Sequence, residues 1–136
     1  MAAVEVQNFL ARAGDFLKGM ERLRDDLAQY RSSSALLGIH GAISYSDALR
    51  TGMGSNGVSS DDHRSAAREL KRMLTDRNFD KPQGADRLAK LLGKKRGIEY
   101  SAHALKENTA GDIVDQAQRF AAWAEEIGRK LKIEGW

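Results

Sequence analysis

Two residues in the last third of the chain, Arg96 and His103, are of types that could act together on a phosphodiester. A guanidinium carries a permanent charge and can hold a phosphate through two parallel hydrogen bonds. An imidazole titrates near neutral pH, so it can take up and release a proton. In a second interpretation, Arg96 is one exposed member of the basic run Lys94-Lys95-Arg96, and His103 is a loop residue without a catalytic role. Residue types alone leave both interpretations open.

Tyr100 lies between these two residues and completes the set of candidate catalytic residues, Arg96, His103 and Tyr100. If one helix ran through positions 96 to 103, about 700° of rotation would return His103 to within about 20° of Arg96. Tyr100, four residues after Arg96, would then direct its hydroxyl toward the same cleft. Gly97 and the pair Ser101-Ala102 argue against a continuous helix, so this alignment depends on where the helix ends.

Basic residues gather in the middle of the chain, although the formal charge of the whole is only +3. From Asp61 to Lys106 there are twelve Lys and Arg residues against seven Asp and Glu, whereas the remainder has ten against twelve. This asymmetry permits a polyanionic partner such as RNA, and it is also common on solvated helix faces. The candidate nucleic-acid-binding residues are Lys94, Lys95, Arg96, Arg68 and Arg72.

Other kinds of chemistry find little support in the sequence. The chain has no cysteine, and its three histidines, at positions 40, 63 and 103, do not form a metal-binding motif. The glycine-rich segment 52–57 is neither preceded by a β-strand nor followed by Gly-Lys-Ser or Gly-Lys-Thr, which favours a surface loop over a nucleotide site. His40, Ser44 and Asp47 share one helix face and are interpreted as a polar row in the core. We therefore predict neither a metal nor a cofactor.

The elements that position these residues are predicted to be helices. A single proline, the absence of alternating β-branched runs and many Ala, Leu, Arg, Lys and Glu residues indicate an all-α protein of four to five helices. At 136 residues the chain is most simply one domain, residues 1–136. Apolar periodicity predicts helices at about Val4–Arg31, at about Ala35–Arg50, from after Ser59-Ser60 to near Asn78, from Pro82 onward, and from Thr109 through Leu131. The stretch from Thr51 to Ser60 is predicted to be a loop.

Polar residues before three of these helices are predicted to act as N-caps. They are Ser32-Ser33-Ser34 for the second helix, Ser59-Ser60 for the third and Thr109 for the fifth. The second helix is also rich in glycine and alanine, which cost helix propensity and let another backbone approach closely. We therefore expect it to be the central and most buried helix.

Neither a membrane span nor a signal peptide is predicted. The longest apolar run is far short of the roughly 20 residues needed to cross a bilayer, and Glu5 and Asn8 interrupt the start of the chain. We expect a soluble, cytoplasmic protein that does not associate with membranes.

Two segments resemble the HEPN superfamily of small helical bundles. They are Leu91-Leu92-Gly93-Lys94-Lys95-Arg96-Gly97-Ile98-Glu99-Tyr100-Ser101, which enters a final helix with Ala117, Phe120 and Trp123, and Gly41-Ala42-Ile43-Ser44-Tyr45-Ser46-Asp47-Ala48-Leu49. The likeness covers most of the chain from about Leu36 to Leu131. It implies an up-and-down bundle that forms a homodimer, in which an Arg-x(4–6)-His motif of both subunits faces a shared cleft.

Active members of the superfamily are metal-independent endoribonucleases, commonly of toxin–antitoxin or phage-defence systems. The resemblance therefore implies that Arg96 holds the scissile phosphate and that His103 assists proton transfer as the 2′-hydroxyl of RNA attacks. Gly97 stands where the family usually has a polar residue, and the spacer of six residues is the longest that the motif allows. The alternative is a non-catalytic interaction module whose partner would be a cognate antitoxin or a nucleotidyltransferase. The sequence leaves open whether the chain is an enzyme.

Overall fold

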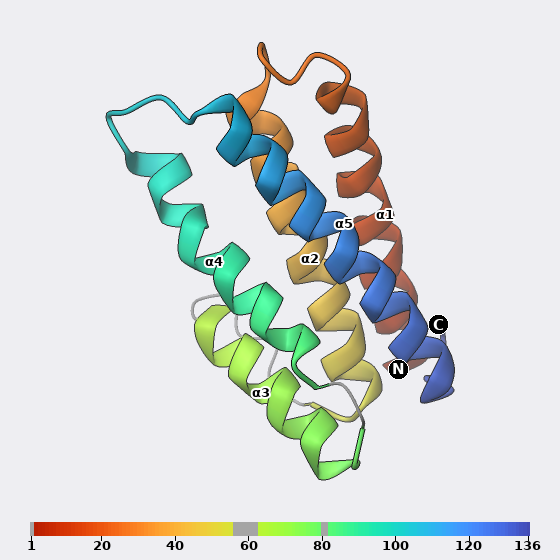
Figure 1. Cartoon of the computed structure of the whole chain (residues 1–136). Coiled ribbons are helices and arrows are strands. Elements are labelled where there is room, and N and C mark those ends of the chain that lie inside the picture. The colour runs from red at the N-terminus through yellow and green to blue at the C-terminus, as the bar shows by residue number, and fades with distance from the viewer. Residues whose placement is uncertain (1, 56–62, 80–81) are drawn as a thin grey trace.

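The computed structural model of the protein describes residues 2–55, 63–79 and 82–136, and these form an all-helical bundle, as predicted. No strand occurs within those ranges. Figure 1 shows that α1 and α2, α3 and α4, and α4 and α5 run antiparallel to each other. The helices of the described ranges are α1 (Ala2–Arg24), α2 (Arg31–Gly52), α3 (His63–Asp76), α4 (Gly84–Tyr100) and α5 (Glu107–Lys130).

The central helix of the bundle is α2, which contacts each of the other four and buries most of its residues. Its glycines allow close packing against α1. A Cβ at Gly38 would lie 2.8 Å from Sδ of Met20, and a Cβ at Gly41 would lie 2.8 Å from Cδ2 of Leu17. Small residues are therefore required at these contacts, and the prediction that the second helix is central and closely packed is confirmed.

The predicted boundary between the first two helices was wrong. α1 ends at Arg24 and not near position 31, and α2 begins with Arg31, so the three serines lie inside α2. The N-cap of α2 is Tyr30, which makes no capping side-chain hydrogen bond. The buried Ser34 hydroxyl instead donates to the Met20 carbonyl over 2.9 Å. This serine therefore joins two helices and does not begin one.

The apolar stripe of α5 is buried at Ile113, Ala117, Phe120, Ala124 and Ile127. Leu131, the predicted end of this helix, is partly buried and follows the end of α5 at Lys130. The predicted Thr109 cap was wrong, because α5 begins at Glu107 after an extended Lys106 that makes no side-chain cap. The long, straight face of α5 forms one wall of the candidate site described below.

The ranges of α2, α3 and α4 differ slightly from the predicted ones. α2 continues to Gly52, beyond the predicted end at Arg50, and α3 ends at Asp76. The predicted Ser59-Ser60 cap and residues 56–60 of the predicted loop lie outside the described residues. α4 begins at Gly84, because Pro82 belongs to a turn in which its carbonyl accepts the N–H of Ala85 over 3.1 Å.

None of the described helices is long and apolar enough to cross a membrane.

Candidate functional site

Helix geometry divides the basic run Lys94-Lys95-Arg96 among different surfaces. All three residues lie within α4, where each step turns the side chain by about 100°, so Lys94 and Arg96 project about 200° apart. Lys94 Nζ lies 3.5 Å from the carboxylate of Asp112 on α5, whereas Lys95 pairs with Glu99 of its own helix over 2.6 Å. Arg96 is exposed. The run is therefore not one continuous basic patch.

The three candidate catalytic residues are all open to solvent at the end of α4. Arg96 and Tyr100 are four residues apart on the same side of the helix, and Tyr100 is 77% exposed. The helix ends at Tyr100, because Ser101 turns to an extended conformation (ψ 141°). His103 lies beyond that end and is exposed, and its backbone N–H donates to Ser101 Oγ over 3.1 Å. Arg96 and His103 thus belong to a helix and to the segment that follows it, and helix periodicity does not align them.

The two α3 candidates are exposed and have local partners. Arg68 donates to the hydroxyl of Ser65 over 3.2 Å, and Arg72 pairs with Asp76 over 2.9 Å. Lys71, between them, pairs with Asp86 over 2.9 Å and so ties α3 to the start of α4. Much of the positive charge of α3 is therefore balanced within the α3–α4 pair.

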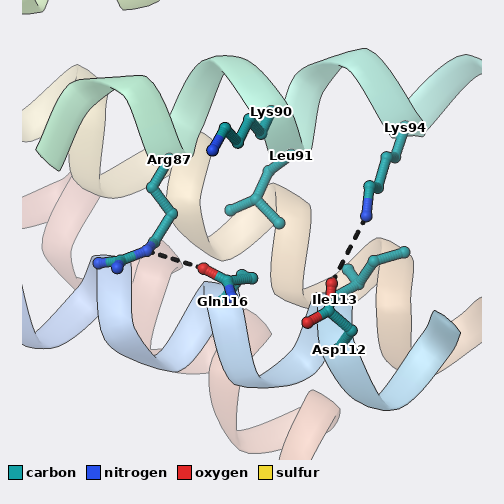
Figure 2. Close-up of a pocket in the computed structure, with 7 residues that line it drawn as sticks. All are labelled: Arg87, Lys90, Leu91, Lys94, Asp112, Ile113 and Gln116. Atoms are coloured by element: carbon teal, nitrogen blue, oxygen red, sulfur yellow. Dashed lines mark hydrogen bonds and ion pairs between the residues drawn. The ribbon is translucent and has the colours of Figure 1, made fainter. Parts of the chain in front are cut away.

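A hollow of about 350 Å³ lies between α4 and α5. Its α4 wall carries Arg87, Lys90 and Lys94, whose spacing of three and four residues puts them within about 60° of each other around the helix. Its α5 wall carries Asp112 and Gln116. Figure 2 shows Arg87 and Lys94 reaching α5, with Lys90 between them. The lining therefore holds three cations and one carboxylate.

The floor and the contacts across this hollow are well defined. Leu91 and Ile113 close the floor, and both are buried. Arg87 Nε donates to the side-chain oxygen of Gln116 over 2.8 Å, and the Lys94–Asp112 ion pair is about half exposed. Lys90 is exposed and makes no ion pair with any residue in the described ranges. Arg87 and Lys90 are thus the two cations of the hollow whose charge no carboxylate of the described residues balances.

A second hollow, of about 520 Å³, continues the first toward the start of α4. The two share Arg87, Lys90 and Gln116, and the second ends at Trp123 of α5. We call the two together the α4–α5 trough, lined by Arg87, Lys90, Leu91, Lys94, Asp112, Ile113 and Gln116, with Gln83, Gly84, Asp86 and Trp123 at one end.

Trp123 is held in place at that end by close contacts. A Cβ on Gly84 would lie 2.0 Å from the indole ring, so only a glycine leaves the ring where it is. On α5 itself, the Phe120 ring centroid is 5.3 Å from that of Trp123. The trough therefore combines a row of cations, an apolar floor and a positioned aromatic ring.

Sequence reasoning missed two of the three cations in this row, Arg87 and Lys90. Attention to consecutive basic residues led to Lys95 and Arg96, which point elsewhere. The signal that identifies the row is the spacing of Arg87, Lys90 and Lys94 at three and then four residues, the same periodicity that reveals an apolar stripe.

The remaining polar residues of α2 have structural environments. The half-buried ring of His40 lies 5.4 Å from that of Phe16, and Asp47 accepts a 2.7 Å bond from Arg50. Ser44, between them in the predicted polar row, is buried. No group of three His, Cys, Asp or Glu residues in the described ranges is arranged to hold a metal ion.

Comparisons with known proteins returned no match to any family model, to any curated protein or to any solved structure. The resemblance to HEPN proteins thus rests on the motifs of the sequence.

Proposed function

We propose that this protein binds RNA through the α4–α5 trough. The observation that carries the proposal is the row of Arg87, Lys90 and Lys94 along one wall, with Lys90 lacking an ion pair among the described residues. Cations in a concave surface concentrate the electrostatic field and attract polyanions. The row extends along about 10 Å of helix axis, given a rise of about 1.5 Å per residue. A ligand with repeated charges fits such a row better than a single small anion does.

Substitution of the central cation tests this proposal. Lys90→Glu reverses the charge at an exposed position, so the fold should be retained, and we expect RNA affinity at low salt to fall about tenfold through loss of a charge-assisted contact. Lys18→Glu makes the same change in net charge on α1, which does not contact α4. Equal losses of affinity in the two variants would show that only the net charge matters, and the trough would not be the site.

We propose further that Arg96, Tyr100 and His103 contribute to RNA cleavage in a homodimer, as the resemblance to HEPN proteins implies. Their exposure at the end of α4 leaves them accessible to RNA and to a second copy of the chain. General acid–base catalysis contributes about a hundred to ten thousand-fold, so His103→Ala should remove cleavage measured with EDTA present. Lack of cleavage by the unaltered protein, or cleavage unchanged in His103→Ala, would contradict the catalytic role.

The dimer is tested separately from cleavage. Light scattering at tens of micromolar should give twice the mass of one chain. A mass of one chain, independent of concentration, would remove the shared-cleft arrangement and leave RNA binding by the trough unaffected.

A second candidate function, a protein-interaction module, is favoured by the exposure of Tyr100. Tyrosine is enriched at protein interfaces, where its ring is buried against a partner. The partner would be a cognate antitoxin or a nucleotidyltransferase. Association with such a protein that is lost in Tyr100→Ala, without any RNA binding, would favour this function.

A further inference from the structure

We infer that the α4–α5 trough accepts a single strand of nucleic acid lying along α4 and excludes a double helix. This inference rests on the proposed function and specifies the form of the ligand. RNA and DNA strands offer the same backbone charge and bases, and the experiment below distinguishes them.

The width of the trough is the first argument. α4 and α5 pack directly against each other, and the axes of packed helices lie about 8–10 Å apart. Leu91 and Ile113 close the space between them from below. A double helix presents a convex surface wider than such a space, so only its edge would touch the rim. A single strand can enter and reach the floor.

The arrangement of cations is the second argument. Along the axis of α4, Lys90 lies about 4.5 Å beyond Arg87, and Lys94 lies about 6 Å beyond Lys90. Cations in a line of this kind follow a backbone whose phosphates succeed one another along the same direction. Contacts of this type fix the position of a strand and carry no sequence information by themselves.

The wall opposite the cations is the third argument, because it can receive bases. The apolar floor lies between the two walls, and Gln116 directs its side-chain oxygen to Arg87. Its amide NH₂, which has no hydrogen-bond partner in the described part of the chain, is then the donor for a base edge. Trp123 lies at one end, held by Gly84. A cationic groove next to an aromatic ring is the usual design of sites for single strands.

Two carboxylates in the lining restrict where the phosphates of the strand can bind. Asp112 pairs with Lys94 in the empty trough, and Asp86 lies at the Trp123 end, where Lys71 holds it. A phosphate that contacts Lys94 must displace Asp112 or approach beside it. Asp112→Asn removes this competing charge, so we expect it to strengthen binding, whereas most substitutions in a binding site weaken it.

Fluorescence of Trp123 provides the test. The chain has two tryptophans, Trp123 and Trp136, so Trp136→Phe in the full-length protein leaves Trp123 as the only one. This protein is titrated at about 50 mM salt with oligouridylate, oligodeoxyuridylate and an RNA duplex of equal length. We expect both single strands to quench Trp123 emission and to bind at least about tenfold more tightly than the duplex, with a tenfold change corresponding to one charge-assisted contact. Quenching by only one of the two strands identifies the sugar that the trough selects.

Substitutions in the same background locate the strand. Lys90→Glu should weaken single-strand binding about tenfold, Asp112→Asn should strengthen it, and Lys18→Glu should leave it nearly unchanged. Duplex binding as tight as single-strand binding, or single-strand binding that leaves Trp123 emission unchanged, would overturn the inference while the proposed RNA binding stands. No binding of any nucleic acid would overturn both.

Discussion

Arg50 has the largest side chain that is fully buried in the described core, with 1% of its surface exposed. It lies near the end of α2, where its two terminal nitrogens reach Asp47 over 2.7 Å and Glu69 of α3 over 3.4 Å. A buried guanidinium is tolerated because both carboxylates compensate its charge, and removal of one partner leaves the others without compensation. Arg50 therefore holds α3 against α2 through charge.

We predict that Arg50→Ala lowers the free energy of unfolding by about 3 kcal/mol, the cost of breaking a buried ion pair. Urea denaturation followed by circular dichroism measures the change. Arg72→Ala is the matched control, because its pair with Asp76 is exposed and separated by four residues, and such pairs contribute about 0.5 kcal/mol or less. Similar losses in both variants would show that burial of Arg50 carries no special weight.

Two glycines of α4 should respond in opposite ways to alanine. A Cβ at Gly84 would lie 2.0 Å from Trp123, so Gly84→Ala must displace the ring and should destabilise the protein by about 1–3 kcal/mol, as overpacking does. A Cβ at Gly93 meets nothing within 4 Å, so Gly93→Ala should stabilise α4 by up to about 1 kcal/mol through helix propensity. Thermal unfolding of the two variants measures both effects. Stabilisation by Gly84→Ala would mean that Trp123 is not held as described.

At the scale of single residues, the sequence indicated candidate residues by their chemical type but not by their surroundings. Arg96, Tyr100 and His103 were selected because their side chains suit a phosphodiester, and they lie in the open where α4 ends. Arg50 was not predicted to be buried, because an arginine is rarely fully buried and nothing in its local sequence identifies its partner on α3. Contacts between distant helices decide such cases, and they have no local signal.

At the scale of elements, α4 is one helix with two basic faces. The trough face carries Arg87, Lys90 and Lys94, and the outer face carries Arg96, about 200° from Lys94. The first serves the proposed binding of a strand, and the second serves the proposed cleavage. Because they are separate, substitutions can affect one proposal without the other.

We predict that RNA affinity falls steeply with salt and that the two faces of α4 contribute differently. Each phosphate contact with a single strand adds about 0.7 to the slope of log affinity against log salt. Lys90→Ala should therefore reduce the slope by about 0.7, whereas Arg96→Ala should reduce cleavage measured at saturating RNA. Titrations between about 50 and 200 mM salt measure the slope. A slope unaffected by Lys90→Ala, or an affinity indifferent to salt, would contradict the assignment of the faces.

The helices themselves were largely predictable, since apolar periodicity identified the helices of the described ranges. The ends of the helices were harder to predict. Ser34 and Thr109 are good N-cap residues by type, yet Ser34 donates to the Met20 carbonyl, and α5 begins two residues before Thr109. At Ser34 a tertiary contact outweighed the local capping preference.

At the scale of the whole molecule, residues 131–136 pack against the C-terminal ends of α2 and α5. Ile133 lies against Gly52 of α2, and the Trp136 ring lies against Gly128 of α5. Glu125 accepts hydrogen bonds from the Tyr45 hydroxyl over 2.8 Å and from the Trp136 indole over 3.3 Å. Burial, followed by the neighbouring Glu125 carboxylate, raises the pKa of Tyr45 well above its ordinary value.

This shift makes the fold sensitive to alkali in a defined direction. Above its ordinary pKa of about 10, Tyr45 releases its proton in the unfolded chain but keeps it in the folded protein. The folded state then binds more protons, so the stability present below pH 10 falls as the pH rises. We predict that the stability of the unaltered protein relative to Tyr45→Phe decreases by about 1.4 kcal/mol between pH 9 and pH 11. Urea denaturation at both pH values measures the difference, and a constant difference would contradict the role of Tyr45.

The packing of residues 131–136 also brings the beginning and the end of the described chain together. Gly135 has a φ of 92°, and a Cβ there would lie 2.4 Å from the carbonyl oxygen of Ala3. The labels N and C lie close together in Figure 1. Termini that meet in this way tolerate circular permutation. A short glycine-rich linker joining these two ends would allow the chain to be opened at another surface turn, where a fluorophore or a surface tether could be attached.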